Sequence, residues 1–217
     1  MNAIRDSGVI AVIRATSSRE LVKVAEAMAA GGIKAIEVSM TTPDAIDVLL
    51  RAKESGFQGV AFGAGTVIDV PMALRVLDAG ADFVLSPAFD PDVIATCAQR
   101  GIPAIPGCLT PTEIVAARTA GAQLIKIFPA SVGGPQLIRD ILSPLPDLEL
   151  IAVGGVDQRN AAEYIRAGAC AVGVGSSLFH EGPEGFDYRA ITQAARDLLA
   201  AVRRVRQSAT PAITDDQ

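Results

Sequence analysis

The sequence predicts a single-domain α/β protein, an eight-stranded parallel (β/α)8 TIM barrel, and three observations favour this class. Short, nearly continuous apolar runs alternate with helix-like stretches, as expected of parallel strands covered by helices. A glycine ends most helix-like stretches: Gly32, Gly56, Gly80, Gly101, Gly121 and Gly168. The spacings between these glycines are 24, 24, 21, 20 and 47 residues, and the last spacing covers two repeat units. Eight such units in 217 residues match a small barrel.

The expected strands follow one another with one helix between each pair. In chain order they are 8–13, 35–38, 60–65, 82–86, 103–106, 124–128, 150–155 and 171–175. Thr42, Asp90 and Thr110 each precede a proline and are expected to cap helices. Ser17 and Thr110 have a glutamate three residues later, the spacing of a capping box. A doubly wound open sheet is the alternative, but it usually opens with a glycine fingerprint that this chain lacks.

Composition limits the partners and the location. Residues 1–206 are expected to form the barrel domain, and residues 207–217, which lose all periodicity, a disordered tail. A net charge of -5 and a pI of about 4.9 argue against a nucleic-acid partner. No apolar stretch is long enough to span a membrane, and residues 1–6 do not resemble a signal peptide. A cytoplasmic protein is therefore expected.

The cysteines and the histidine argue against a metal centre. Cys97, Cys108 and Cys170 are odd in number, widely spaced and set among apolar or small neighbours, which favours reduced thiols. His180 is the only histidine, so a histidine-based metal site is not available. No metal and no other cofactor is expected.

Two charged residues lie inside expected strands. Strand residues alternate between the helices and the barrel axis, so Glu37, between Ile36 and Val38, is expected to point inward. The same alternation turns Lys126 inward. A buried structural ion pair is one interpretation. Two observations favour a functional interpretation of Glu37 and Lys126 instead. Lysine is scarce, with four residues against fifteen arginines, and Arg14 adds a charge at the end of the first strand.

The functional interpretation is a Schiff-base site. Apolar surroundings lower the pKa of a lysine ammonium, and the neutral amine is the form that attacks a carbonyl. A carboxylate across the barrel then moves protons to and from the resulting imine. Lys126 and Glu37 are the expected catalytic residues.

Small residues end several strands. Gly154 and Gly155 follow the seventh strand, and Gly175 and Ser176 follow the eighth, where barrels commonly bind phosphate through backbone N–H groups. Each pair alone is an ordinary tight turn, but together they favour a phosphate site. Thr66, which follows Gly63-Ala64-Gly65, is suited to binding a carboxylate, and Pro87 is suited to lining the same opening of the barrel. The alternative for both residues is that they only form turns at the strand ends.

Eight segments together are similar to one known family. They are AVIRA (11–15), AIEVSMTTP (35–43), GAGTV (63–67), LSPAFD (85–90), IPGCLTPTE (105–113), LIKIFPAS (124–131), AVGGV (152–156) and AVGVGSSL (171–178). Over about residues 5–205 the chain resembles the class I aldolases that cleave 2-keto-3-deoxy-6-phosphogluconate (KDPG), many of which also act on 4-hydroxy-2-oxoglutarate (KHG).

The resemblance implies roles that agree with the interpretation above. Lys126 would form the Schiff base, Glu37 would be the general acid and base, Thr66 would bind the pyruvyl carboxylate, and Phe128 would pack beside the imine. The phosphate would be held by three residues: Gly154, Gly155 and Ser176. The implied reaction gives pyruvate and glyceraldehyde 3-phosphate in the Entner-Doudoroff route. The family also implies a homotrimer.

One departure leaves the substrate open. Thr41 stands where some relatives carry an arginine, so Arg14 is expected to bind the anion instead. The galactonate-phosphate aldolases share the KIFP, GPQ and AVGGV segments, so cleavage of the C4 epimer is the alternative substrate reaction. A phosphate-binding barrel that isomerises or merely binds its ligand is the alternative from another class.

Overall fold

The computed structural model describes residues 1–179, 181–182 and 185–209, and its main sheet is a parallel barrel. The strands are β1 (Val9–Ile13), β2 (Ala35–Ser39), β3 (Ala61–Gly65), β4 (Val84–Leu85), β5 (Ala104–Ile105), β6 (Gly107–Cys108), β7 (Leu124–Ile127), β8 (Glu149–Val153) and β9 (Ala171–Val174). Their order is β5-β4-β3-β2-β1-β9-β8-β7-β6. The predicted barrel class is confirmed. A short antiparallel pair, β10 (Glu181–Gly182) and β11 (Gly185–Phe186), follows β9.

One barrel strand is divided by a proline. β5 pairs with β4 and β6 pairs with β7, and Pro106 lies between them. Proline has no N–H to donate to a neighbouring strand, but its carbonyl accepts a hydrogen bond of 2.9 Å from the Lys126 N–H. Residues 104–108 thus act as one strand that closes the barrel, and they extend two residues beyond the expected end at 106.

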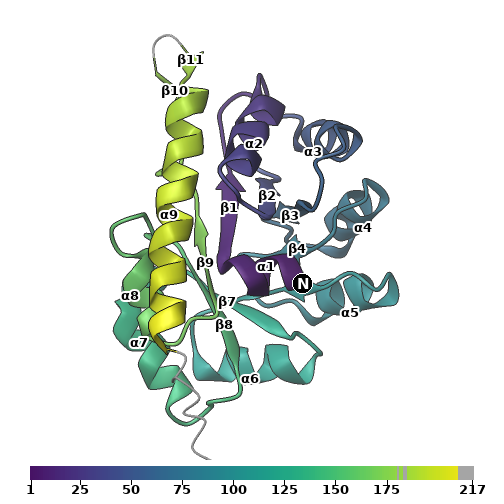
Figure 1. Cartoon of the computed structure of the whole chain (residues 1–217). Helices are drawn as coiled ribbons and strands as arrows, with labels where there is room; N and C mark the ends of the chain where they lie inside the picture. The colour runs from purple at the N-terminus through teal and green to yellow at the C-terminus, as the bar shows by residue number, and fades with distance from the viewer. Residues whose placement is uncertain (180, 183–184, 210–217) are drawn as a thin grey trace, which may run out of the picture.

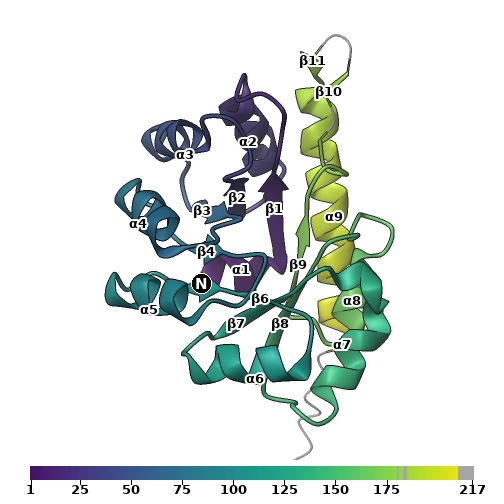
Figure 2. The same ribbon diagram turned by 180° about the vertical axis from the view of Figure 1, so that it is seen from behind.

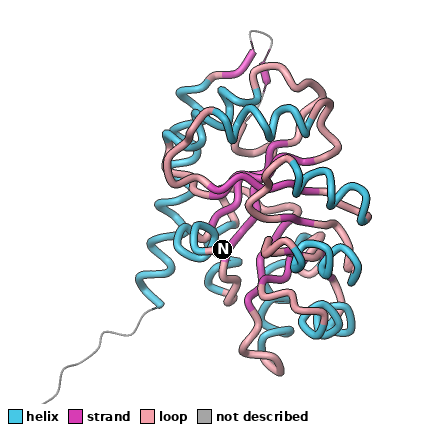
Figure 3. Tube along the Cα trace, turned by 90° about the vertical axis from the view of Figure 1, so that its right-hand side faces the viewer, coloured by secondary structure: helices cyan, strands magenta, loops and turns pink. Residues whose placement is uncertain are grey.

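The helices surround the strands, as Figure 3 shows. They are α1 (Asn2–Ser7), α2 (Leu21–Ala30), α3 (Ala45–Glu54), α4 (Val70–Asp78), α5 (Pro91–Gln99), α6 (Pro111–Thr119), α7 (Gly134–Leu142), α8 (Ala161–Arg166) and α9 (Tyr188–Ala209), with a 3-10 turn, η1 (Ala130–Val132). The long helix α9 packs against both α2 and α8 and so joins the two ends of the helix layer (Figures 1 and 2).

Some of the expected helix caps are present and others are wrong. Thr110 forms a full capping box at the start of α6, and the Asp90 carboxylate accepts from two backbone N–H groups of α5. Thr42 and Ser17 do not cap: α3 begins at Ala45 and α2 at Leu21. Thr42 Oγ1 instead accepts a hydrogen bond of 3.3 Å from the backbone N–H of Ala15, in the loop after β1.

Two apolar clusters form the core and follow the predicted alternation. Ile36, Val38, Ile125 and Ile127 pack in the outer cluster between the strands and the helices. The barrel interior is filled by a second cluster: Ile10, Val12, Ala35, Phe83, Leu85, Ile105, Leu124, Ile151, Val153 and Ala171. Ile4 of α1 belongs to this second cluster and is fully buried, so α1 seals the amino end of the barrel.

Several sequence predictions concern the periphery. Helix α9 continues to Ala209, past the expected domain end at residue 206. Residues 210–217 of the expected tail lie outside the described residues. His180 also lies outside them. Cys97, Cys108 and Cys170 are free thiols. Within the described ranges, no helix is both long enough and apolar enough to cross a membrane.

Candidate active site

Glu37 and Lys126 lie inside the barrel, as the alternation predicts. They are 1% and 4% exposed, on β2 and β7 respectively. A Cβ atom at Gly65 would lie 1.6 Å from Glu37 Oε1, so only glycine leaves room for this carboxylate. At Gly63, a Cβ would collide with the Phe83 ring at 2.2 Å. The glycines of β3 therefore make room for interior side chains of the protein itself.

The two buried charges are not in contact. Lys126 and Glu37 make no ion pair within 4.0 Å, and Glu37 Oε2 is buried without a hydrogen-bond partner among the described residues. Buried carboxylate oxygens are usually hydrogen-bonded. A pair retained for stability would be in contact, so this arrangement favours the functional interpretation over a structural ion pair.

Burial disfavours the charged form of both groups. It raises the pKa of Glu37, an effect that the positive charges of Lys126 and Arg14 oppose. Burial also lowers the pKa of Lys126, which the Glu37 charge opposes and the Arg14 charge reinforces. A neutral amine and a protonated carboxyl are therefore both accessible nearer to neutral pH than for exposed side chains. This is the electrostatic setting that nucleophilic and proton-transfer chemistry requires.

Phe128 lies beside the lysine. Lys126 Nζ is 4.5 Å from the centroid of the Phe128 ring, within the range of a cation–π contact. A Cβ atom at Gly154 would lie 3.2 Å from the same ring. The ring is thus confined between the amine and the loop that follows β8.

A cluster of hydroxyl groups lies at the carboxyl ends of β1, β2 and β3. Arg14 Nε donates to Ser39 Oγ at 3.3 Å, and Arg14 Nη2 donates to Thr66 Oγ1 at 3.4 Å. Ser39 Oγ lies 2.9 Å from Thr66 Oγ1 and also 2.9 Å from Thr41 Oγ1. Arg14 and Thr66, both predicted, are thus brought together through Ser39.

Sequence reasoning missed Ser39 as a site residue, although a signal was present. It follows Glu37 by two positions on the same strand, so alternation places both side chains on the inward face. Its side chain is completely buried. The two-residue spacing from Glu37 alone could have indicated that the Ser39 hydroxyl points into the barrel beside the predicted site.

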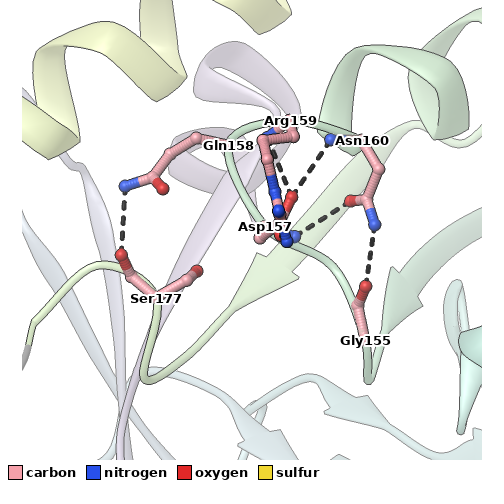
Figure 4. Close-up of polar contacts among 6 residues, drawn as sticks. All are labelled: Gly155, Asp157, Gln158, Arg159, Asn160 and Ser177. Carbon is pink, nitrogen blue, oxygen red and sulfur yellow. Dashed lines mark hydrogen bonds and ion pairs between the residues drawn. The ribbon is translucent and has the colours of Figure 1, made fainter.

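The glycine loops after β8 and β9 face each other and are tied together. Between the two loops, Gln158 Nε2 donates to the Ser177 carbonyl at 3.1 Å (Figure 4). Within the loop after β8, Asn160 Nδ2 donates to the Gly155 carbonyl at 2.8 Å. In the described part of the chain, the backbone N–H groups of Gly154, Gly155 and Ser176 donate no hydrogen bond. They are available to an anion, which supports the predicted phosphate site.

The loop after β8 has an internal scaffold that the sequence reasoning also missed. The Asp157 carboxylate accepts from the backbone N–H groups of Arg159 and Asn160 and forms an ion pair of 2.6 Å with the Arg159 side chain (Figure 4). Asn160 Oδ1 accepts from the Asp157 N–H at 2.9 Å. Gly154 and Gly155 have φ values of 92° and 75°, which glycine adopts readily. These residues fix the course of the loop.

Two remaining predictions concern the rim and metals. Pro87 follows β4, and a Cβ atom at Gly107 would lie 2.3 Å from the Pro87 carbonyl oxygen, so these two residues are packed together at the rim. Among residues 1–179, 181–182 and 185–209, no group of three histidine, cysteine or acidic residues is arranged to hold a metal ion.

The fold and the site together define an α/β-barrel enzyme of the lyase class that carries a lysine in its interior. The family model of KDPG and KHG aldolase matches residues 1–194, and the chain belongs to this aldolase family. The predicted family is thereby confirmed.

Individual relatives agree with this assignment. The chain is 40% identical over 193 residues to the "Probable 2-dehydro-3-deoxy-6-phosphogalactonate aldolase" of Rhizobium meliloti (strain 1021), covering 88% of this chain and 90% of the relative. A solved native KDPGal structure superposes with a TM-score of 0.85 at 30% identity, covering 92% and 96%. A KDPG aldolase from Legionella pneumophila, solved with pyruvate captured as a covalent carbinolamine, gives 0.76 at 29% identity, covering 94% and 96%.

Proposed function

We propose that this protein is a class I aldolase that cleaves a 2-keto-3-deoxy-6-phospho sugar acid to pyruvate and glyceraldehyde 3-phosphate. The observation that carries the proposal is the buried amine of Lys126, whose pKa is lowered by burial, in the same interior as the unpaired Glu37 carboxyl. The covalent carbinolamine of the Legionella pneumophila relative supports a lysine-based mechanism.

The reaction begins at Lys126. Its neutral Nζ attacks the C2 carbonyl carbon, and the resulting carbinolamine takes up one proton from solvent and loses water to give the iminium ion. The Glu37 carboxylate takes the proton of the C4 hydroxyl as the C3–C4 bond breaks, and the bonding electrons flow into the iminium to give the enamine. After the aldehyde leaves, Glu37 returns the proton to C3. Hydrolysis of the imine then releases pyruvate and regenerates Lys126.

The remaining predicted residues bind the substrate. Arg14 and Thr66 hold the carboxylate, since they present positive charge and a hydroxyl at the same rim. Phe128 packs beside the imine and Pro87 lines the entrance. The backbone N–H groups of the two glycine loops hold the phosphate: Gly154, Gly155, Gly175 and Ser176.

The galactonate series is the proposed substrate preference. The Rhizobium meliloti relative, 40% identical, is named for the 6-phosphogalactonate substrate, which supports this preference. Cleavage of KDPG itself, and of the shorter KHG to pyruvate and glyoxylate, are the alternative activities. Family membership supports both.

The family also supports a proposal for assembly and location. We propose that residues 1–206 act as one domain, that the enzyme is a cytoplasmic homotrimer, and that it works without a metal or other cofactor. A designed protein cage built by fusing symmetric oligomeric domains superposes on this chain with a TM-score of 0.86. This likeness supports oligomerisation.

Borohydride reduction in the presence of pyruvate tests the proposed function. Reduction of the imine should leave one pyruvyl adduct per chain on Lys126, identified by mass analysis of peptides. Steady-state rates with both C4 epimers and with KHG then rank the substrates. Absence of an adduct at Lys126 would favour a barrel that binds or isomerises a phosphorylated ligand instead.

Gly175→Val should weaken binding of phosphorylated substrates selectively. A Cβ atom at this position meets only Val12 atoms at 3.7 Å and beyond, so the fold accepts it, while the branched side chain obstructs the anion. We expect KM for the phosphorylated substrates to rise about tenfold or more and KM for KHG, which has no phosphate, to change about twofold at most. Equal changes for both substrates would place the phosphate elsewhere on the rim.

Gly155→Val is a less selective variant of the same site. Gly155 has a φ of 75°, and a Cβ atom there would lie 2.6 Å from Ser131 Cβ, so this substitution also distorts the loop. Thermal unfolding of both variants separates loss of folding from loss of binding. Gly175→Val should keep the wild-type melting temperature, so a rise in KM for this variant reports on phosphate binding and not on folding.

A further inference from the structure

We propose that Ser39 is a positioning residue that directs the Thr66 hydroxyl to donate a hydrogen bond to the substrate carboxylate. The inference rests on the proposed function in one respect, namely that the anion bound beside Thr66 is the carboxylate of a 2-keto acid. Ser39 Oγ already has three hydrogen-bond partners in Arg14, Thr41 and Thr66, so its hydroxyl has no donor or acceptor left for the substrate. It acts through Thr66 and Arg14.

The hydrogen bonds around Ser39 leave little freedom. A hydroxyl group has one proton to donate and two lone pairs to accept. Arg14 Nε only donates, so it occupies one lone pair of Ser39 Oγ. One lone pair and one proton remain for Thr41 and Thr66, both at 2.9 Å. Ser39 therefore accepts from one threonine and donates to the other.

These limits on Ser39 Oγ allow two arrangements of the hydroxyl protons. In the first, Thr41 donates to Ser39 and Ser39 donates to Thr66; Thr66 Oγ1 then accepts from Ser39 and from Arg14 Nη2, and its own proton is free. In the second, Thr66 donates to Ser39 and the free proton lies on Thr41. A carboxylate can only accept hydrogen bonds, so an anion beside Thr66 selects the first arrangement.

The position of Thr66 makes this direction useful. Its φ of 61° is unusual for a β-branched residue, so the fold, and not local preference, determines where its hydroxyl lies. The next residue, Val67, is anchored by a bond of 3.1 Å from its N–H to the Leu85 carbonyl. With the backbone held in this way, the remaining variable is the direction of the Thr66 hydroxyl proton, and the proton that Ser39 donates keeps Thr66 in the donor arrangement that the anion selects.

Substitutions at Ser39 should separate binding from chemistry. We expect Ser39→Ala to raise KM for the 2-keto acid substrate about fivefold to tenfold while kcat falls about threefold at most. Ser39→Thr retains the hydroxyl and should restore KM to within about twofold of wild type. A purely structural role would instead lower the melting temperature of both variants and change kcat as much as KM.

A double-mutant cycle with Thr66→Val tests whether Ser39 acts through Thr66. Thr66→Val alone should raise KM, and adding Ser39→Ala in that background should produce no further rise, since the donor to be directed is already gone. Additive effects, or an unchanged KM for Thr66→Val, would overturn the proposal. The borohydride adduct at Lys126 is measured in every variant; its absence in the wild type would overturn the proposed aldolase function, whereas its presence with additive effects overturns only the role of Ser39.

Discussion

Lys126→Ala should abolish aldol cleavage, lowering kcat/KM by about 10⁴-fold or more, because no other described group near the site supplies a neutral amine. Lys126→Arg should be equally inactive, since a guanidinium stays protonated. The wild-type rate of imine formation should fall as the pH drops through the lowered pKa of Lys126, because only the neutral amine attacks. Stopped-flow or coupled assays with the phosphorylated substrate measure both effects.

The control for this prediction is Lys34→Ala, which removes an exposed lysine just before the amino end of β2, opposite the carboxyl ends where the site lies, and should leave activity unchanged. Circular dichroism should show that the Lys126 variants keep the barrel, and Lys126→Met serves if the alanine variant unfolds, since it fills the same volume without charge. Aldol cleavage within about tenfold of the wild-type rate in any folded Lys126 variant would contradict the imine mechanism.

Glu37→Gln should reduce kcat by about 10²-fold to 10⁴-fold while leaving the imine intact. The amide keeps the shape of the carboxyl, so it fits the space that Gly65 leaves, but it cannot exchange protons with the C4 hydroxyl or with C3. Exchange of the pyruvate methyl protons with solvent, followed by NMR, should slow by a similar factor, because it uses the same proton transfer without the aldehyde.

A matched control for Glu37 is Glu26→Gln, which changes an exposed glutamate on α2 and should have no effect. Borohydride trapping should still label Lys126 in Glu37→Gln, which separates proton transfer from attack on the carbonyl. Methyl-proton exchange at the wild-type rate in this variant would assign the acid and base role to another group.

Much of the fold was predictable because its signals are local. Apolar runs, terminating glycines and proline-linked caps such as Asp90 and Thr110 each report on a few neighbouring residues. The inward direction of Glu37 and Lys126 followed from strand alternation alone. The cap at Thr42 was wrong because its hydroxyl accepts a hydrogen bond from the loop after β1, a tertiary contact. The cap at Ser17 was wrong because its hydroxyl accepts from the Arg19 N–H in the loop before α2.

Several of the contacts that were missed join residues that lie far apart in the chain. Gln158 reaches Ser177 across the space between two loops, and no local pattern indicates that contact. Ser39, Thr66 and Arg14 come from three different strand ends that meet only when the barrel closes. The space that the glycines of β3 leave for Phe83 and Glu37 became visible only in the three-dimensional structure.

The seal that α1 forms beneath the barrel implies an order of departure for the products. Because Ile4 closes the amino end, Lys126 is approached from the carboxyl ends of the strands. In the proposed mechanism, the pyruvyl fragment bonded to Lys126 lies behind the aldehyde fragment, which extends toward the loops after β8 and β9. We therefore expect glyceraldehyde 3-phosphate to leave first and pyruvate last, so that pyruvate competes with incoming substrate for the empty enzyme.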